Sequence, residues 1–409
     1  MKAVIKAVVL VSGVALAMAA HAQVIDQGER GKLSPTGLIS TAAIIDKDGK
    51  VVVWGYRELG QQGNGVKVVA ATDPPARVNS LSNINYLATG SYHLLALDSL
   101  RNVYGWGWNT NGETGCSTST QPVNTPCRIL TGVDQIAAGE YFSMARTAAG
   151  QVYTWGKNEA GQLGNGTTTK SHTPVQVNLN GERARIIGAA TRGGFAVTLN
   201  GHVWAWGENE ASGLGFQGPG FGTSAPVLTP TRVPNLEPYA ANIKYIGGGQ
   251  GWGEALLYDG RVIGWGLRSA IGVGKFHDVT TESSPVPIQI MDGVETLFAR
   301  YDGSVAIAVK RDLEDNIIGK YVYTWGLSTL APTPNTTLSP FGLRMIYGEA
   351  PKLHYMTNQP TAVGGGRQFT LYQTSDGKIW GVGYNHQNKL DMTTVTGSNI
   401  HWPGIEINL

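Results

Sequence analysis

The side chains that can carry acid–base chemistry are few and widely spaced in this chain. The candidates are Asp98, Glu140, Glu254, Asp302 and His93. Hydrolysis by paired carboxylates requires two such groups at a defined separation, which their positions along the chain do not set. No Gly-x-Ser-x-Gly elbow, His-Glu-x-x-His helix or phosphate-binding loop accompanies them. A hydrolase or lyase with a site in a central channel is therefore an alternative function, and no catalytic residue is predicted.

Cofactor and metal binding have no support in the sequence. Gly213-Leu-Gly-Phe-Gln-Gly218 matches the dinucleotide-binding string as letters, but a Pro/Gly-rich loop follows it instead of a helix. No pair of His or Cys residues with the spacing of zinc ligands is present near the two cysteines. We predict neither a cofactor nor a metal site.

Recognition by aromatic and arginine side chains is better supported. Similar short turns recur along the chain, and their residues are of the types that dominate protein-binding hot spots, because Tyr, Trp and Arg bury much area and keep a polar group. The predicted partner-binding ring consists of Tyr92, Tyr141, Arg192, Trp252, Tyr301 and Arg367. Core packing is the alternative for Trp252, and equally for Phe142 and Phe369. A second aromatic set, Tyr56, Trp108 and Tyr384, is expected on the opposite rim.

These turns belong to a repeat. Six Trp-Gly pairs and a degenerate Val382-Gly383 recur at intervals of 49 to 60 residues. Such spacing indicates supersecondary units that bury their apolar surfaces only by stacking. The repeated tryptophans are predicted to pack between units, where the indole N–H needs a partner, commonly a neighbouring carbonyl. They are Trp54, Trp106, Trp155, Trp206, Trp265 and Trp325.

Each unit has the pattern of four short antiparallel strands. Dipeptides such as Asp259-Gly260 read as tight hairpin turns between two apolar runs. A proline then opens a further strand, as in Pro174-Val-Gln-Val177, because proline suits the first residue or the edge of a strand. Seven such units predict an all-β, seven-bladed β-propeller over residues 37–409, working as a monomeric ring. We expect the C-terminal strand, residues 403–409, to join and complete the first blade. Unit six carries an insertion from Lys310 to Lys320.

The N-terminus resembles a secretory signal. Lys2 and Lys6 precede an apolar run, and Ala20-His21-Ala22 offers small residues for cleavage after Ala22. We predict a cleaved signal peptide at residues 1–22, a lead segment at 23–36, and a secreted or periplasmic protein with no membrane attachment. Without Lys2 and Lys6, basic and acidic residues are equal in number, which argues against a nucleic-acid partner.

The chain has only two cysteines, Cys116 and Cys127, within one loop of the second unit. Export to an oxidising compartment favours a disulfide between them over two free thiols.

The repeat resembles the regulator of chromosome condensation repeat family. Gly150-Gln-Val-Tyr-Thr-Trp-Gly-Lys-Asn-Glu-Ala-Gly-Gln-Leu-Gly164, followed by Pro174-Val-Gln-Val177, carries the resemblance, which spans about residues 37 to 409. The resemblance implies a seven-bladed propeller. Eukaryotic members exchange guanine nucleotide on a small GTPase, so an effector acting on a host GTPase is one alternative. Among secreted bacterial members, one resembles this chain in size, seven-blade count and export, and it inhibits β-lactamases. We therefore predict a protein-binding module, serving as an inhibitor or adaptor for another protein.

Overall fold

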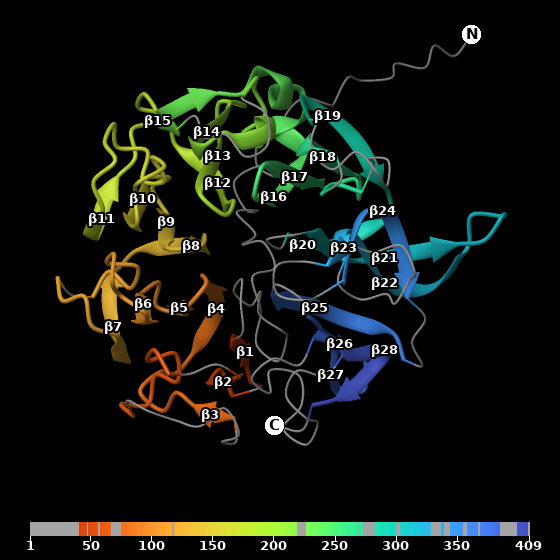
Figure 1. The fold of residues 1–409 in the computed structure, drawn as a ribbon, viewed down its shortest axis with the longest axis horizontal. Coiled ribbons are helices and arrows are strands. Elements are labelled where there is room, and N and C mark those ends of the chain that lie inside the picture. The colour runs from red at the N-terminus through yellow and green to blue at the C-terminus, as the bar shows by residue number, and fades with distance from the viewer. Residues whose placement is uncertain are drawn as a thin grey trace, which may run out of the picture.

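Seven antiparallel sheets form a closed ring (Figure 1). The computed structural model describes residues 41–46, 48–55, 58–66, 75–116, 118–218, 226–268, 270–272, 283–299, 303–328, 337–338, 344–354, 358–366, 369–384 and 399–407. The predicted all-β, seven-bladed propeller is confirmed. The predicted signal and lead segments, residues 1–22 and 23–36, lie outside the described residues. In the part of the chain that the structure describes, no helix is long and apolar enough to cross a membrane.

Within each blade the strands lie side by side, in an order that leads from the centre of the ring to its circumference (Figure 1). Blade one contains β1 (Thr41–Ile45), β2 (Val51–Gly55) and β3 (Ala76–Arg77). Blades two and three contain β4 (Ile84–Thr89), β5 (His93–Asp98), β6 (Val103–Gly107), β7 (Val123–Leu130), β8 (Val133–Ala138), β9 (Phe142–Thr147), β10 (Val152–Gly156) and β11 (Ser171–Gln176). Blade four contains β12 (Ala184–Ala189), β13 (Gly193–Thr198), β14 (Val203–Glu208) and β15 (Pro226–Arg232).

The remaining three blades follow the same order. Blade five contains β16 (Ile243–Gly249), β17 (Trp252–Leu257), β18 (Val262–Leu267) and β19 (Ser283–Met291). Blade six contains β20 (Val294–Ala299), β21 (Gly303–Arg311), β22 (Ile317–Ser328), β24 (Arg344–His354) and the short β23 (Thr337–Leu338). Blade seven contains β25 (Pro360–Gly366), β26 (Phe369–Thr374), β27 (Ile379–Tyr384) and β28 (Asn399–Glu406). Two 3-10 helices are present among the described residues: η1 (Glu210–Ser212) lies in the β14–β15 connection and η2 (Pro234–Asn242) in the β15–β16 connection.

The repeated tryptophans fill the interfaces between blades, as predicted. All six are at most 1% exposed. Four indole N–H groups donate to a backbone carbonyl of the preceding blade: Trp106 to Gln61 at 2.8 Å, Trp155 to Glu113 at 3.0 Å, Trp206 to Gln162 at 2.9 Å and Trp265 to Gly213 at 2.9 Å. Each of these four tryptophans therefore contributes apolar area and one directional bond across an interface, whereas the buried Nε1 of Trp325 has no hydrogen-bond partner among the described residues.

The recurring spacing between the Trp-Gly pair and the glycines that follow it is explained by the loop that contacts the tryptophan of the next blade. In blade three, Asn158 accepts a bond from the Leu163 N–H at 2.9 Å, and Gln162 accepts one from the Ala160 N–H at 2.9 Å. These bonds fold the loop so that Gly164, with φ +61°, lies under the indole of Trp206. A Cβ atom at Gly164 would lie 2.8 Å from that ring, so only glycine fits there.

The ring closes by side-chain packing between blades seven and one. The prediction that the C-terminal strand joins and completes the first blade is wrong. β28 pairs with β27 of its own blade, with Ile405 opposite Gly381 and Glu406 opposite Trp380. The proline-led strand is the last strand of the sheet in blades one to five, and the C-terminal copy follows the same rule in blade seven. The seam instead consists of an apolar cluster in which Ala42, Ile44, Val52 and Trp54 of blade one meet Ala362, Phe369, Leu371, Ile379 and Ile407 of blade seven.

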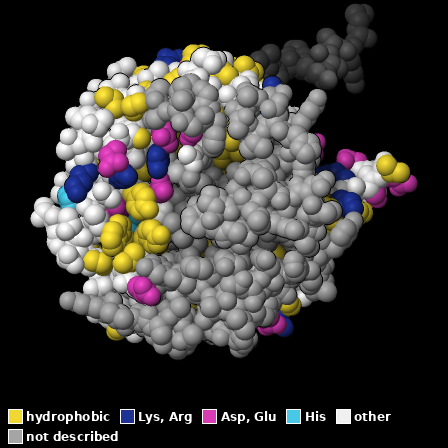
Figure 2. Space-filling view, viewed as in Figure 1, with side chains coloured by type: hydrophobic (Ala, Val, Ile, Leu, Met, Phe, Trp, Pro, Cys, Tyr) yellow, Lys and Arg dark blue, Asp and Glu magenta, His cyan; other side chains and the backbone are white. Residues whose placement is uncertain are grey.

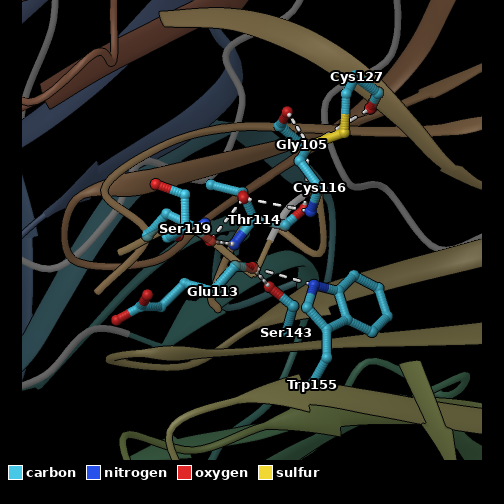
Figure 3. Close-up of a disulfide and its surroundings, with 9 residues drawn as sticks. Gly105, Glu113, Thr114, Cys116, Ser119, Cys127, Ser143 and Trp155 are labelled. Atoms are coloured by element: carbon cyan, nitrogen blue, oxygen red, sulfur yellow. Dashed lines mark hydrogen bonds between the residues drawn. A yellow bond between two sulfur atoms is a disulfide. The ribbon is translucent and has the colours of Figure 1, made fainter. Parts of the chain in front are cut away.

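The predicted disulfide between Cys116 and Cys127 is present, with a Cα–Cα distance of 5.8 Å. It joins the β6–β7 loop to β7 (Figure 3). In the same loop, Asn109 accepts bonds from the Thr114 N–H and hydroxyl at 3.1 and 2.7 Å. The disulfide and these bonds hold the segment whose Glu113 carbonyl accepts the indole N–H of Trp155 and the hydroxyl of Ser143 (Figure 3).

Candidate functional site

The innermost turns of blades two to four are tied together around the ring. The Ser91 N–H donates to the Glu140 carbonyl at 3.0 Å, and the Glu140 N–H donates to the Thr191 carbonyl at 2.8 Å. Each turn carries one partly exposed side chain of the predicted ring, namely Tyr92, Tyr141 and Arg192. The backbone bonds therefore set the spacing of these three side chains along one rim.

A second set of side chains lies on the same rim, beside the first. The residue that follows each Trp-Gly pair donates its N–H to the carbonyl of the turn residue: Trp108 to Tyr92 at 2.9 Å, Lys157 to Tyr141 at 2.8 Å, and Glu208 to Arg192 at 2.9 Å. The expected placement of Trp108 on the opposite rim is therefore wrong. Two antiparallel strands, β5 and β6, lie between Tyr92 and Trp108, so the chain returns to the same side of the ring.

We call the group Tyr92, Trp108, Glu140, Tyr141, Lys157, Arg192 and Glu208 the aromatic rim. Figure 2 shows hydrophobic side chains gathered next to acidic and basic ones on the described part of this face. The rings of Tyr92 and Tyr141 lie 6.3 Å apart with an interplanar angle of 31°. The Lys157 ammonium lies 5.6 Å from the centre of the Tyr141 ring, a cation–π contact. Two tyrosines from adjacent blades thus form one continuous apolar surface with a basic edge.

Arg192 connects this surface to blade four through two ion pairs. Its Nε lies 3.0 Å from a Glu140 carboxylate oxygen, and its Nη1 lies 3.5 Å from a Glu208 carboxylate oxygen. The Arg192 side chain is 39% exposed, whereas those of Glu140 and Glu208 are 17% and 11% exposed. The guanidinium is therefore held in place and still reaches solvent, which suits a contact residue.

The electrostatic surroundings keep both tyrosines neutral at physiological pH. Burial, followed by the negative charge of Glu140, raises the pKa of Tyr92. The same two causes, in the same order, raise the pKa of Tyr141 to about 12. Both phenols therefore remain hydrogen-bond donors as well as apolar surfaces.

The structure does not place the whole predicted ring on the surface. Trp252 is 1% exposed and packs against Ala211, Leu267, Ala270 and Ile271, so the packing alternative holds and it is not a contact residue. Phe142 and Phe369 are also fully buried. Tyr301, Arg367 and Tyr56 lie outside the described residues, as does the side chain of Tyr384. Lys157 and Glu208 were missed by sequence reasoning, although both stand two positions after a repeated tryptophan, as Trp108 does.

The acid–base candidates are engaged in structural roles. Asp98 caps its own hairpin turn through the N–H groups of Leu100 and Asn102, at 2.9 and 2.8 Å. Glu254 is fully buried and accepts the Ser304 hydroxyl at 2.7 Å. Asp302 lies outside the described residues. Among the described residues, no group of three or more His, Cys, Asp and Glu side chains could hold a metal ion.

His93 resembles a general base by distance alone. Its Nε2 lies 2.9 Å from the Ser143 hydroxyl, but Ser143 in turn donates to the Glu113 carbonyl at 2.8 Å. His93 is 1% exposed and Ser143 is fully buried. The pair therefore joins blades two and three, and neither group is accessible to a substrate.

Burial of His93 makes stability depend on pH. Desolvation lowers its pKa from 6.5 to about 3. Because the unfolded chain binds the proton at higher pH than the folded one, stability is complete above pH 6.5 and falls as the pH drops toward 3. We expect wild-type protein to lose about 2 kcal/mol more between pH 7 and pH 5 than His93→Phe, as measured by urea unfolding.

Phenylalanine is the matched replacement at this position, because Phe142 stands opposite Gly156 as His93 stands opposite Gly107. Identical pH dependence of the two proteins would contradict a neutral, buried His93.

The comparison with family models decides the classification. The RCC1-like domain model matches residues 42–339. The chain belongs to the RCC1-like domain family. The matched residues run from β1 to just beyond β23, and the strand pairing extends the same ring through blade seven.

Curated relatives in this family match over shorter stretches. Protein RCC1 of Candida albicans is 34% identical over 213 residues, covering 50% of this chain and 37% of that protein. Protein pim1 of Schizosaccharomyces pombe is 38% identical over 89 residues, covering 21% of this chain and 16% of that protein. The matches therefore span well under two thirds of these relatives.

Solved structures of similar shape support the fold alone. Prp20p from Saccharomyces cerevisiae, whose description concerns its binding to Gsp1p and histones, superposes with a TM-score of 0.68 at 20% identity, covering 92% of this chain and 87% of that one. Human WBSCR16 superposes with a TM-score of 0.66 at 18% identity, covering 88% and 95%.

Proposed function

We propose that this RCC1-like propeller is a protein-binding module whose contact surface is the aromatic rim. The carrying observation is that backbone hydrogen bonds hold Tyr92, Tyr141 and Arg192 at fixed spacing on one rim, each beside a second partly exposed side chain. A preorganised surface binds with a smaller entropy loss than a flexible one. Neighbouring aromatic and arginine side chains are the composition expected of a hot spot.

The proposed setting is the periplasm or the extracellular medium, where the module acts as an inhibitor or adaptor. The signal-like N-terminus, residues 1–22, and the disulfide between Cys116 and Cys127 support this setting, because disulfides persist in oxidising compartments. The partner is therefore expected among exported proteins.

The test replaces both tyrosines of the rim. Tyr92→Ala/Tyr141→Ala should weaken binding of a partner captured from the exported proteins of the producing organism by about 100-fold, because two hot-spot side chains are lost. The melting temperature should change little, since both side chains are partly exposed. Binding is measured by calorimetry with the purified partner.

Leu199→Ala is the matched control, because Leu199 is 59% exposed and lies in the β13–β14 turn on the other rim. Unchanged affinity in the double variant, or equal weakening by Leu199→Ala, would refute the proposed contact surface.

Family membership favours a second function, nucleotide exchange on a small GTPase. The description of Prp20p names binding to Gsp1p, and the fold of that protein matches this chain. Release of labelled GDP from a panel of purified small GTPases decides between the two functions. Acceleration by the wild-type propeller would establish exchange activity, and its absence across the panel leaves the binding module.

A further inference from the structure

A β-hairpin on blade six extends beyond the ring. Within the sheet, β22 pairs with β24 from Val322 onward, and β21 pairs with β20 up to Ala308. The chain between these residues continues outward as a two-stranded ribbon, paired from Val309 opposite Lys320 to Arg311 opposite Ile317. Figure 1 shows the β21–β22 hairpin projecting away from the other blades. We call residues 311–318 the hairpin tip.

The hairpin tip exposes apolar side chains that the fold does not need. Leu313, Ile317 and Ile318 are 107%, 58% and 49% exposed. Single exposed leucines are common on protein surfaces, whereas here three large aliphatic side chains are exposed within six positions at one end of the hairpin. Figure 2 shows this projection carrying hydrophobic, acidic and basic side chains.

The turn that carries Leu313 is ordered by its own hydrogen bonds. The Asp312 carboxylate accepts the N–H groups of Glu314 at 2.9 Å and Asn316 at 2.8 Å. Arg311 donates to the Asp315 carbonyl at 2.7 Å. Asp98 orders its own hairpin turn in the same way, so this network is a general device of the fold; at the tip it holds the turn that exposes Leu313 in one conformation.

The charges around the tip specify what it can bind. The nearby cations are engaged: Arg311 pairs with Asp315, Lys320 pairs with Glu295 at 2.7 Å, and Lys310 lies 5.8 Å from the Tyr321 ring centre. Glu314, next to Leu313, is exposed and has no ion pair among the described residues. Residues 310–320 carry three basic and three acidic side chains, and Glu295 makes the balance one negative charge. The carboxylates of Asp312 and Glu314, on either side of Leu313, are in no ion pair among the described residues, so they favour a basic partner over an anionic lipid surface.

We propose that the hairpin tip is an anchor that inserts Leu313, with Ile317 and Ile318, into an apolar pocket of a partner protein rimmed by lysine or arginine. The exposed aliphatic side chains supply the apolar contact, and the carboxylates of Asp312 and Glu314 complement a basic rim. This surface is separate from the aromatic rim, which belongs to blades two to four.

The test places a photo-crosslinking amino acid at position 313 of the full-length chain in the producing organism. Leu100, which is 79% exposed in the β5–β6 turn, is the matched control position. We expect a protein adduct from position 313 and none of that mass from position 100.

The adduct partner is then purified and its affinity for the propeller is measured. Leu313→Ser should weaken binding by at least about tenfold, and Glu314→Lys should weaken it by about threefold or more with a smaller dependence on salt. Leu100→Ser should leave the affinity unchanged, and so should Asp48→Lys, because Asp48 is an exposed acidic residue in the β1–β2 turn of blade one. Absence of an adduct, an adduct with lipid or with a second copy, or unchanged affinity of Leu313→Ser would each overturn the proposal.

Discussion

Replacement of Trp155 by alanine should lower the free energy of unfolding of the propeller by about 4 kcal/mol. Trp155 is fully buried between blades two and three, where it packs with Leu95, Ile136 and Ala145. Removing the indole leaves a large cavity that rigid β-sheets on both sides cannot close, and it deprives the Glu113 carbonyl of one donor. Chemical unfolding followed by circular dichroism measures the difference.

Trp155→Phe separates packing from hydrogen bonding at the same site. Phenylalanine restores most of the apolar volume, and the Glu113 carbonyl still accepts the Ser143 hydroxyl at 2.8 Å. We expect this variant to recover more than half of the lost stability, because the second donor spares the carbonyl the full cost of an unpaired buried group. Equal losses in the two variants would show that the directional bond, and not the packing, holds the interface.

The tryptophans were predictable because their role is local and periodic. A large flat side chain that recurs at one spacing, each time before a glycine, must occupy equivalent positions in stacked units. The indole acceptors confirm this logic, since Trp155 and Trp206 both reach a carbonyl in the preceding loop, of Glu113 and Gln162 respectively. The identity of each acceptor required the structure, as did the finding that the buried Nε1 of Trp325 has no partner among the described residues.

The site was less predictable, because the exposure of a turn residue depends on its position within the turn. Trp252 stands opposite Gly266 as Phe142 stands opposite Gly156, so it takes the buried position of its turn, where Ala211 of η1 and Ala270 cover it. Tyr141 takes the preceding, partly exposed position, which Gly251 occupies in blade five. The side of the ring reached by Trp108 could have been deduced by counting antiparallel strands. The closure could not be deduced in this way, because a proline-led strand pairs equally well, by pattern alone, with either adjacent hairpin.

Deletion of residues 403–409 should destabilise the ring by at least about 3 kcal/mol, even though the C-terminal strand does not join the first blade. The deletion removes Ile407, which is 9% exposed in the cluster at the seam and whose N–H donates to the Ile379 carbonyl at 2.7 Å. It also removes the ion pair of Glu406 with Lys378 and uncovers the edge of β27.

Hydrogen exchange distinguishes the two modes of closure. Because β28 pairs with β27, the deletion should abolish protection first at Trp380 and Gly381, which stand opposite Glu406 and Ile405. The amides of β1 should lose protection less, since their strand partner is β2 and only the packing of Ala42 and Ile44 against blade seven is weakened. The reverse order, with β1 opening before β27, would mean that the C-terminus completes the first blade in solution.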